Sequence, residues 1–306
     1  MDSSRVADDL SRAPARDHSD IGPTVLRIIV GARLRRLRES ADVTTEDAGE
    51  VIRASHSKIS RLELGKTRFK TRDVADLLTH YGVRDEAACA EFASLVRLAN
   101  RPSWWTSYGD VIPAWFETYL GFEQSASVIR SYEAQVVPAL LQTPDYARAL
   151  LSGSDEDASD AAIDQRVDLL MKRQRVLHRP DPVKLWMILD EAVLHRPPGG
   201  VDWDGGEPRP MRAQLRHLID IDSLPHVTVQ LLPFRAGGHP VCGPFTMLRF
   251  HEDEIPDVVY LEHLADASYY DKPADVDRYR DLMDRLTVLA TRPDATLDIL
   301  DRACRA

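Results

Sequence analysis

The sequence predicts two domains, a small all-α domain followed by a mixed α/β (α+β) domain. The 306 residues are too many for one core at the usual size of about 100 to 200 residues per domain. Up to residue 101 apolar residues recur only at helical spacing, whereas beyond it helical stretches alternate with short β-rich runs. We therefore expect a flexible tail over residues 1–23, an all-α domain over 24–101 and an acidic α/β domain over 102–306.

The charge distribution separates the two domains further. Residues 24–72 hold twelve Lys and Arg against six acids, a net charge of +6, so the remainder must carry −16 to reach the total of −10. DNA phosphates attract the first part and repel the second. Three distant cysteines without a CxxC pair indicate a reducing compartment, and no apolar run approaches the roughly 18 to 20 residues of a membrane span. We expect a cytoplasmic protein that makes no membrane contact.

Helical spacing and a capping residue predict the first two helices. After Leu26, apolar residues follow the i, i+4, i+7 spacing of one helix face, at Val30, Leu34 and Leu37. Thr44 can cap a second helix, with Asp47 three residues on in the position of a variant capping box. A break is expected near Arg53.

The third helix is short and begins at the N-cap Ser55. Ile59 and Leu62 point inward, and Gly65 ends the helix. Two more helices follow, one with its apolar face over residues 74–81 and one from residue 85 to 99. Together they complete a five-helix domain.

The second domain mixes both element types. Helical patterns lie near residues 113–121, 144–152, 160–178, 207–221, 273–290 and 294–305. Strand candidates, each short and bounded by Pro, Gly or Asp, lie at residues 183–189, 227–232, 245–250 and 258–261. Such interleaving predicts layers around one sheet.

Residues 44–66, TTEDAGEVIRASHSKISRLELGK, have the layout of a helix-turn-helix. In this motif a first helix braces a second, whose outward side chains enter the major groove while nearby donors hold the phosphates. The second helix offers hydrogen-bonding side chains that we expect to contact bases: His56, Ser57, Lys58 and Arg61. Basic residues that suit backbone contacts follow it: Lys66, Arg68 and Lys70.

The segment from RLRRLRES to LLTHYGV resembles the Xre-type (lambda repressor-like) helix-turn-helix, whose SKxSRxExG pattern stands here as SKISRLELG. The likeness continues through SWWTSYGDVIPAWFETYLGFEQ and LWMILDEAVLHRP, and covers nearly everything from residue 24 to 289. The whole is similar to the actinomycete family of WhiJ-like, antitoxin-like Xre regulators. The resemblance implies control of development or specialised metabolism, a C-terminal domain without settled activity and a small companion protein, encoded nearby, as a candidate partner.

Carried over position by position, the resemblance assigns base contacts to the four residues named above and phosphate contacts to Thr45, Lys66 and Arg68. Two positions depart from the family pattern. Thr45 replaces the usual glutamine, which keeps a hydroxyl donor but shortens its reach. Arg53 replaces the turn glycine, so it must either accept a positive φ at a cost of about 1 kcal/mol or adopt another turn.

Large aromatic residues gather early in the second domain: Trp104, Trp105, Tyr108, Trp115, Phe116, Tyr119 and Tyr132. We favour a packing role for them, because large aromatics dominate burial wherever they occur. The alternative is a pocket for a small-molecule effector or a partner, formed by Trp105, Tyr108, Trp115, Arg130 and Tyr132.

Catalytic, metal and cofactor sites have little support. Asp190 with Glu191, and Glu262 with His263, stand at predicted strand ends, but acids are abundant and we favour helix caps or solvated ends. The spacing of the candidate metal ligands matches no standard zinc pattern: His239, Cys242, His251 and His263. The chain has no GxSxG, no P-loop and no GxGxxG after a strand. We expect neither an enzyme nor a bound cofactor.

These observations favour a sequence-specific regulator that binds double-stranded DNA as a homodimer, with recognition helices about 34 Å apart. The first alternative is an antitoxin-like module that neutralises a small companion protein and regulates its own operon. The others are a helix-turn-helix used only as a protein-binding or dimerisation scaffold, and an enzyme with a vestigial DNA module.

Overall fold

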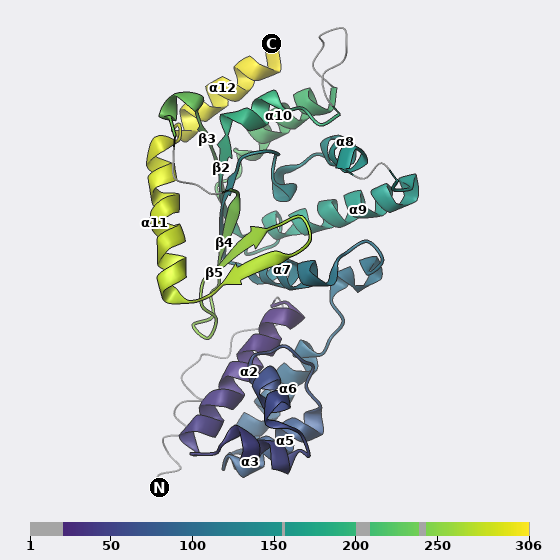
Figure 1. Ribbon diagram of the computed structural model, residues 1–306, viewed down its shortest axis with the longest axis vertical. Coiled ribbons are helices and arrows are strands. Elements are labelled where there is room, and N and C mark those ends of the chain that lie inside the picture. Colours follow the sequence, from purple (N-terminus) through teal and green to yellow (C-terminus); the bar gives the residue numbers. More distant parts are fainter. Residues whose placement is uncertain (1–20, 155–156, 200–208, 239–242, 306) are drawn as a thin grey trace. The chain divides into compact units, whose positions relative to one another are not determined.

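The structure is a computed structural model, and it describes residues 21–154, 157–199, 209–238 and 243–305 (Figure 1). The predicted tail, as far as residue 20, lies outside the described residues. The chain divides into two compact units. Unit 1 comprises Met1–Thr106 and Glu252–Ile255, and unit 2 comprises Ser107–His251 and Pro256–Ala306.

Unit 1 is all-α in its described residues. Its helices are α2 (Pro23–Ser40), α3 (Thr45–Val51), α4 (His56–Glu63), α5 (Thr71–His80) and α6 (Glu86–Ala99). The predicted helices of this domain are thereby confirmed.

The predicted caps of the two central helices are also confirmed. Thr44 caps α3, since its hydroxyl accepts from the Asp47 backbone N–H at 3.1 Å while the Asp47 carboxylate accepts from the Thr44 N–H. Ser55 caps α4, since its hydroxyl accepts from the Lys58 N–H at 3.3 Å. Gly65 follows α4 at φ +66°, a conformation that glycine adopts without the usual Cβ penalty.

Helix α2 packs against α6 and α4 and forms the centre of the unit 1 core. Leu26, Ile29 and Leu34 are almost completely buried on its inner face. At Gly31 the backbones approach so closely that a Cβ would lie 2.5 Å from the Glu63 carbonyl oxygen of α4. Only glycine permits this separation of α2 and α4.

A buried ion pair joins the same two helices. The Arg38 guanidinium of α2 donates two hydrogen bonds to the Glu63 carboxylate of α4, Nε to Oε1 at 2.6 Å and Nη2 to Oε2 at 3.0 Å. Arg38 Nη1 also donates to the Val43 carbonyl before α3. A bidentate pair of this kind fixes orientation as well as distance, so α4 is held in one position against α2.

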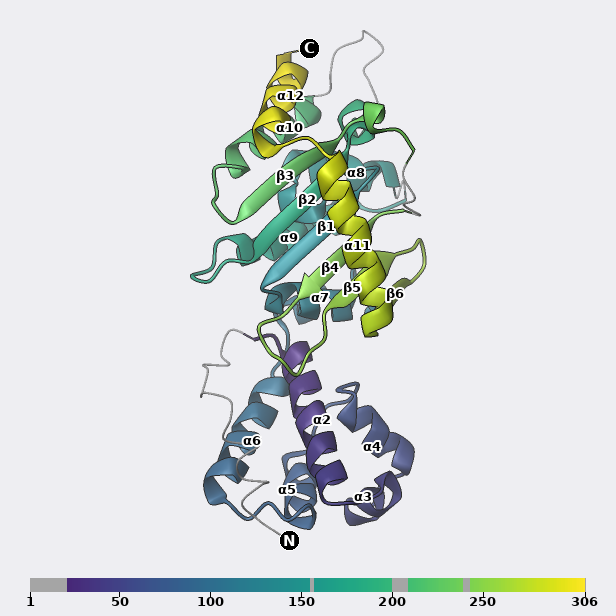
Figure 2. The same cartoon turned by 90° about the vertical axis from the view of Figure 1, so that its left-hand side faces the viewer.

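Unit 2 is built on a mixed sheet. Its strands are β1 (Val128–Glu133), β2 (Lys184–Asp190), β3 (Val227–Leu232), β4 (Phe245–Arg249), β5 (Val258–Glu262) and β6 (Ala267–Tyr270). The order is β3-β2-β1-β4-β5-β6, with β1, β2 and β3 parallel and the remaining neighbours antiparallel (Figure 2). The predicted fold class, an all-α domain followed by an α+β domain, is confirmed.

Helices cover both faces of this sheet. They are α7 (Ala114–Ser125), α8 (Pro144–Ser154), α9 (Asp160–Arg173), α10 (Arg209–Ile221), α11 (Pro273–Leu289) and α12 (Pro293–Arg305). Short 3-10 helices supplement them: η2 (Trp104–Tyr108), η3 (Ala139–Leu141), η4 (Gln174–Leu177), η5 (Glu191–His195) and η6 (Phe234–Ala236). Figure 1 shows α11 along one face and α7 to α10 on the other.

The α11 face holds the main hydrophobic cluster of unit 2. Residues of five strands meet α11 there: Tyr132, Ile188, Leu232, Phe245, Met247, Val259, Val276, Met283 and Leu286. Two strands, β1 and β6, were not among the four that the sequence predicts, and β1 lies at the centre of the sheet. In the described part of the chain, every helix is too short or too polar to cross a bilayer.

Candidate nucleic-acid interface

Helix α4 has one buried side and one exposed side. Ile59 and Leu62 are 1% and 4% exposed and pack into unit 1, whereas His56, Ser57 and Arg61 are exposed. The exposed side chains are a hydrogen-bonding imidazole, a hydroxyl and a guanidinium, which match the donors and acceptors on base edges. The structure thus places three of the four predicted base-contacting residues together on an accessible helix face.

Lys58, the fourth predicted base-contacting residue, is partly engaged within unit 1. Its Nζ lies 3.5 Å from the Asp73 carboxylate of α5, and its side chain is 42% exposed. The contact is long and part-buried, since the Asp73 side chain is only 18% exposed. Asp73 is therefore a partner within unit 1 that competes with DNA for the Lys58 ammonium.

The predicted phosphate-contacting residues lie near both ends of the exposed face. Lys66, Arg68 and Lys70 are exposed in the segment between α4 and α5. Thr45 is the first residue of α3, and its hydroxyl donates to the Glu46 carboxylate at 3.0 Å. That bond gives the Thr45 hydroxyl a competing partner, whereas the side chains of the three basic residues are exposed.

The turn before α4 answers a question that the sequence left open. Arg53 adopts φ +54°, so this residue accepts the left-handed conformation in place of the usual glycine. Gly49 of α3 lies against the turn, and a Cβ on it would be 2.5 Å from the Ala54 carbonyl oxygen. The turn is therefore tight, and α4 keeps the placement expected of a helix-turn-helix.

The structure does not bring together the five residues predicted as a pocket. Trp105 belongs to unit 1 and the other four to unit 2. Arg130 and Tyr132 lie on the α11 side of β1, where Arg130 donates to Asp284 at 2.6 Å and Tyr132 packs in the core. Sequence proximity does not show which face of a sheet a side chain takes, so the sequence alone could not assign Arg130 and Tyr132 to the α11 side.

The remaining two of the five are held on the other side of the sheet. Tyr108 donates to the Asp168 carboxylate of α9 and accepts from Lys172. Trp115 of α7 stacks edge to face on Phe116, and its carbonyl accepts from the Tyr269 hydroxyl at 3.1 Å. Each aromatic residue thus has a packing or hydrogen-bonding role within unit 2.

The acidic pairs at the strand ends also have partners. Asp190 accepts from the Ala192 backbone N–H at 2.9 Å, which caps η5, and Glu191 accepts from the Phe234 N–H at 2.7 Å. Glu262 accepts from the Tyr260 hydroxyl, and His263 contacts Ser268. Within the described residues no group of three His, Cys, Asp or Glu is placed to hold a metal ion, and His239 and Cys242 lie outside them.

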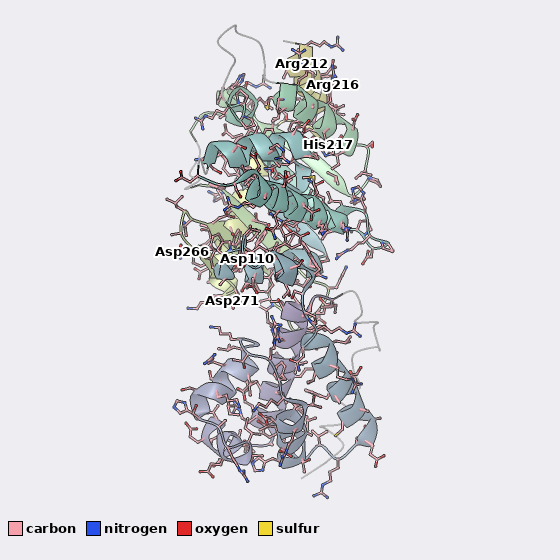
Figure 3. All side chains as sticks on the ribbon, turned by 90° about the vertical axis from the view of Figure 1, so that its right-hand side faces the viewer. Asp110, Arg212, Arg216, His217, Asp266 and Asp271 are labelled. Atoms are coloured by element: carbon pink, nitrogen blue, oxygen red, sulfur yellow. The ribbon has the colours of Figure 1, made fainter. Side chains whose placement is uncertain are left out.

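Charged groups on unit 2 are spread over distant places. Figure 3 shows Arg212, Arg216 and His217 at one end of this unit, and three aspartates toward the other: Asp110, Asp266 and Asp271. Burial lowers the pKa of His217. The labelled acids therefore do not converge with this histidine.

Two family models match the chain. Residues 29–92 match a helix-turn-helix domain, and residues 116–302 match a domain of unknown function, DUF5753. The chain belongs to the DUF5753 family. In this DUF5753 protein the helix-turn-helix match covers most of α2 to α6, so unit 1 is the DNA-binding domain of a regulator. No curated protein and no solved structure matches the chain.

Sequence reasoning missed the residues that hold the interface in place. Arg38 contributes to the positive charge of residues 24–72, but its guanidinium is buried against Glu63. The glutamate of the SRLELG segment is the partner, and its position on the inner side of α4 was the available signal. In the DUF5753 domain, the buried pair of Arg173 with Glu123 at 2.8 Å was likewise not foreseen.

Proposed function

We propose that the protein is a sequence-specific regulator of transcription that inserts α4 into the major groove of double-stranded DNA. The observation that carries this proposal is the exposure of His56, Ser57 and Arg61 on a helix whose opposite side is buried. Lys58 joins them once it leaves Asp73. The positive charge of residues 24–72 supplies the attraction to phosphate that places the helix on the duplex.

The remaining parts of the proposal extend this function. The protein acts as a homodimer in the cytoplasm, on palindromic sites, and is not an enzyme. Its resemblance to the WhiJ-like Xre regulators supports a role in development or specialised metabolism, and the DUF5753 domain would then bind an effector or a partner.

A protein partner is the second candidate function. The acidic charge outside residues 24–72 and the exposed Asp110, Asp266 and Asp271 favour a basic protein over DNA as the ligand of unit 2. An antitoxin-like protein would neutralise such a small companion and bind DNA only at its own operon.

The test is binding to the DNA upstream of the gene, measured by fluorescence anisotropy across a salt series with scrambled DNA as competitor. A regulator binds this DNA tightly in the presence of competitor. Arg61→Ala should weaken binding by about 1 to 3 kcal/mol and relax the preference at one base position. Arg97→Ala removes the same charge from the exposed side of α6 and should leave the base preference unchanged.

Equal affinity for upstream and scrambled DNA would refute sequence-specific regulation and favour the protein-binding function. An unchanged base preference in Arg61→Ala would remove Arg61 from the set of base-contacting residues. Pull-down with the product of a short neighbouring gene distinguishes the antitoxin-like function, which requires a stoichiometric complex.

A further inference from the structure

Four helices of unit 1 end in the same backbone motif. After each of α2, α3, α4 and α5, two backbone N–H groups bond back to carbonyls of the last turn in the pattern of a Schellman motif. For α3 these bonds run from Arg53 N to Glu50 O at 3.1 Å and from Ala54 N to Gly49 O at 2.8 Å. The motif requires a left-handed residue at its first position after the cap.

The residues at this position differ between the four helices. They are Asp42, Arg53, Gly65 and Gly82, all with φ between +54° and +83°. Glycine adopts this conformation freely and aspartate is enriched in it, but a long side chain such as arginine is disfavoured. Arg53 is therefore the one unsuitable residue among four equivalent positions of the described helices.

The position of Arg53 in the chain indicates a role for its side chain. It stands two residues before Ser55, the N-cap of α4, and its side chain is exposed. Among the residues that the structure describes, its guanidinium has neither a hydrogen-bond nor an ion-pair partner. In a helix-turn-helix the N-terminal end of the recognition helix enters the groove, and phosphates line the groove on both sides.

We propose that Arg53 contacts a DNA phosphate beside the point where α4 enters the major groove. The left-handed turn holds an arginine at this position at a cost to the stability of the folded state, which a contact with DNA would offset. Strained residues of this kind are typical of functional sites. The inference rests on the proposed DNA-binding function and adds a contact residue that lies before the recognition helix.

The test compares three substitutions in the full chain. Arg53→Gly relieves the strain and removes the charge, Arg53→Lys keeps both the strain and the charge, and Asp42→Gly places glycine at the matched left-handed turn after α2, where aspartate is less strained than arginine. Native-state hydrogen exchange of unit 1 amides measures stability, and anisotropy over a salt series measures DNA binding.

We expect slower exchange of unit 1 amides in both glycine variants. Arg53→Gly should nevertheless bind DNA about threefold to tenfold more weakly at moderate salt, with a salt slope smaller by about 0.9. Arg53→Lys should keep the wild-type slope, and Asp42→Gly should bind no more weakly than the wild type. The stabilised variant would thus be the weaker binder.

An unchanged affinity and salt slope in Arg53→Gly would overturn the inference, as would an equal loss in Asp42→Gly. These outcomes are distinct from failure of the proposed function, in which the wild-type protein itself does not prefer its upstream DNA over scrambled DNA.

Discussion

Glu133 is a carboxyl group that unit 2 buries at the end of its central strand. The Ser131 hydroxyl donates a hydrogen bond to Glu133 Oε1 at 3.2 Å. Burial raises the pKa of Glu133 to about 8, and the nearby Glu262 carboxylate adds to this effect. The folded protein therefore holds a proton on Glu133 at a pH where an unfolded chain has already released it.

This shift predicts how stability depends on pH. Between the ordinary pKa of 4.5 and about 8 the folded state binds one proton more than the unfolded state, so the contribution of Glu133 to stability is lost as the pH rises. The free energy of unfolding should therefore fall as the pH rises through this range. Glu133→Gln, which mimics the neutral acid, should remove this fall.

The measurement is urea unfolding of both proteins at several pH values between 5 and 8. Glu117→Gln provides the control, since Glu117 is an exposed glutamate on α7 of the same unit. The difference between Glu133→Gln and the wild type should widen with pH, whereas the control should stay parallel to the wild type. Parallel curves for all three proteins would show that Glu133 titrates like an exposed acid.

For single residues, the sequence predicted which side chains are exposed better than it predicted which side chains contact each other. The spacing of Ile59 and Leu62 indicates which side of α4 is inward, and the remaining side chains of this helix follow from it. The partner of Arg38 does not follow from local spacing. Glu63 lies 25 residues away, and only the packing of α2 on α4 brings the two side chains together. A basic residue such as Arg38, which the sequence places within a run of arginines, can thus be buried in an ion pair that holds two helices together.

Helices α2 and α4 depend on a contact that only glycine allows. A Cβ at Gly31 would lie 2.5 Å from the Glu63 carbonyl oxygen and 2.6 Å from that of Leu62, both of them backbone atoms. Gly31→Ala must therefore push α4 away from α2. We expect a loss of about 1 to 3 kcal/mol in the stability of unit 1, and weaker DNA binding because the recognition helix moves.

The same substitution at Gly153 serves as the control. Gly153 lies in α8 of unit 2, and a Cβ there would meet nothing within 4 Å. Alanine favours helix over glycine by up to about 1 kcal/mol, so Gly153→Ala should leave stability unchanged or slightly raised. Hydrogen exchange reports on each unit separately, and faster exchange in α2 and α4 of Gly31→Ala alone is the expected pattern. Normal exchange in Gly31→Ala would mean that the two helices separate without cost.

The central strand of unit 2, β1, could not be predicted from the sequence pattern. Strand β1 reads VIRSYE, with polar residues on both faces, although both neighbours in the sheet are strands. Its polar residues are accommodated individually: Arg130 by Asp284 and Trp186, and Ser131 by Thr246. Those partners come from distant parts of the chain, so the strand lacks the apolar run that identified β2 and β3. Strand β6 is simply too short for a pattern.

The whole molecule combines a cationic region with an anionic remainder. Residues 24–72 carry +6 and the other residues −16, so only the cationic region attracts phosphate. The anionic remainder repels DNA phosphates, which favours an approach through residues 24–72. Specificity for one site then depends on α4 and on how many copies of it engage the duplex at once.

Dimeric binding makes a prediction about the spacing of the DNA site. In the proposed homodimer, two copies of α4 related by a twofold axis would occupy successive major grooves, with half-site centres about 10 base pairs apart. Inserting about five base pairs between the half-sites turns one of them to the opposite side of the duplex and should reduce affinity to that of a single half-site, about 100-fold or more. Inserting about ten base pairs returns both half-sites to the same side of the duplex but increases the distance between them by one helical turn.

Sedimentation of the complex provides the stoichiometry, and anisotropy on the three spacings provides the affinities. Two protomers per duplex on the native spacing, together with a sharp loss on the five-base-pair insertion, is the result that a rigid dimer requires. If one protomer binds and all three spacings are equivalent, each α4 acts alone, and site preference must come entirely from the side chains of one helix. If two protomers bind but tolerate every spacing, the link between the DNA-binding unit and the dimer contact is flexible, and each half-site is selected independently.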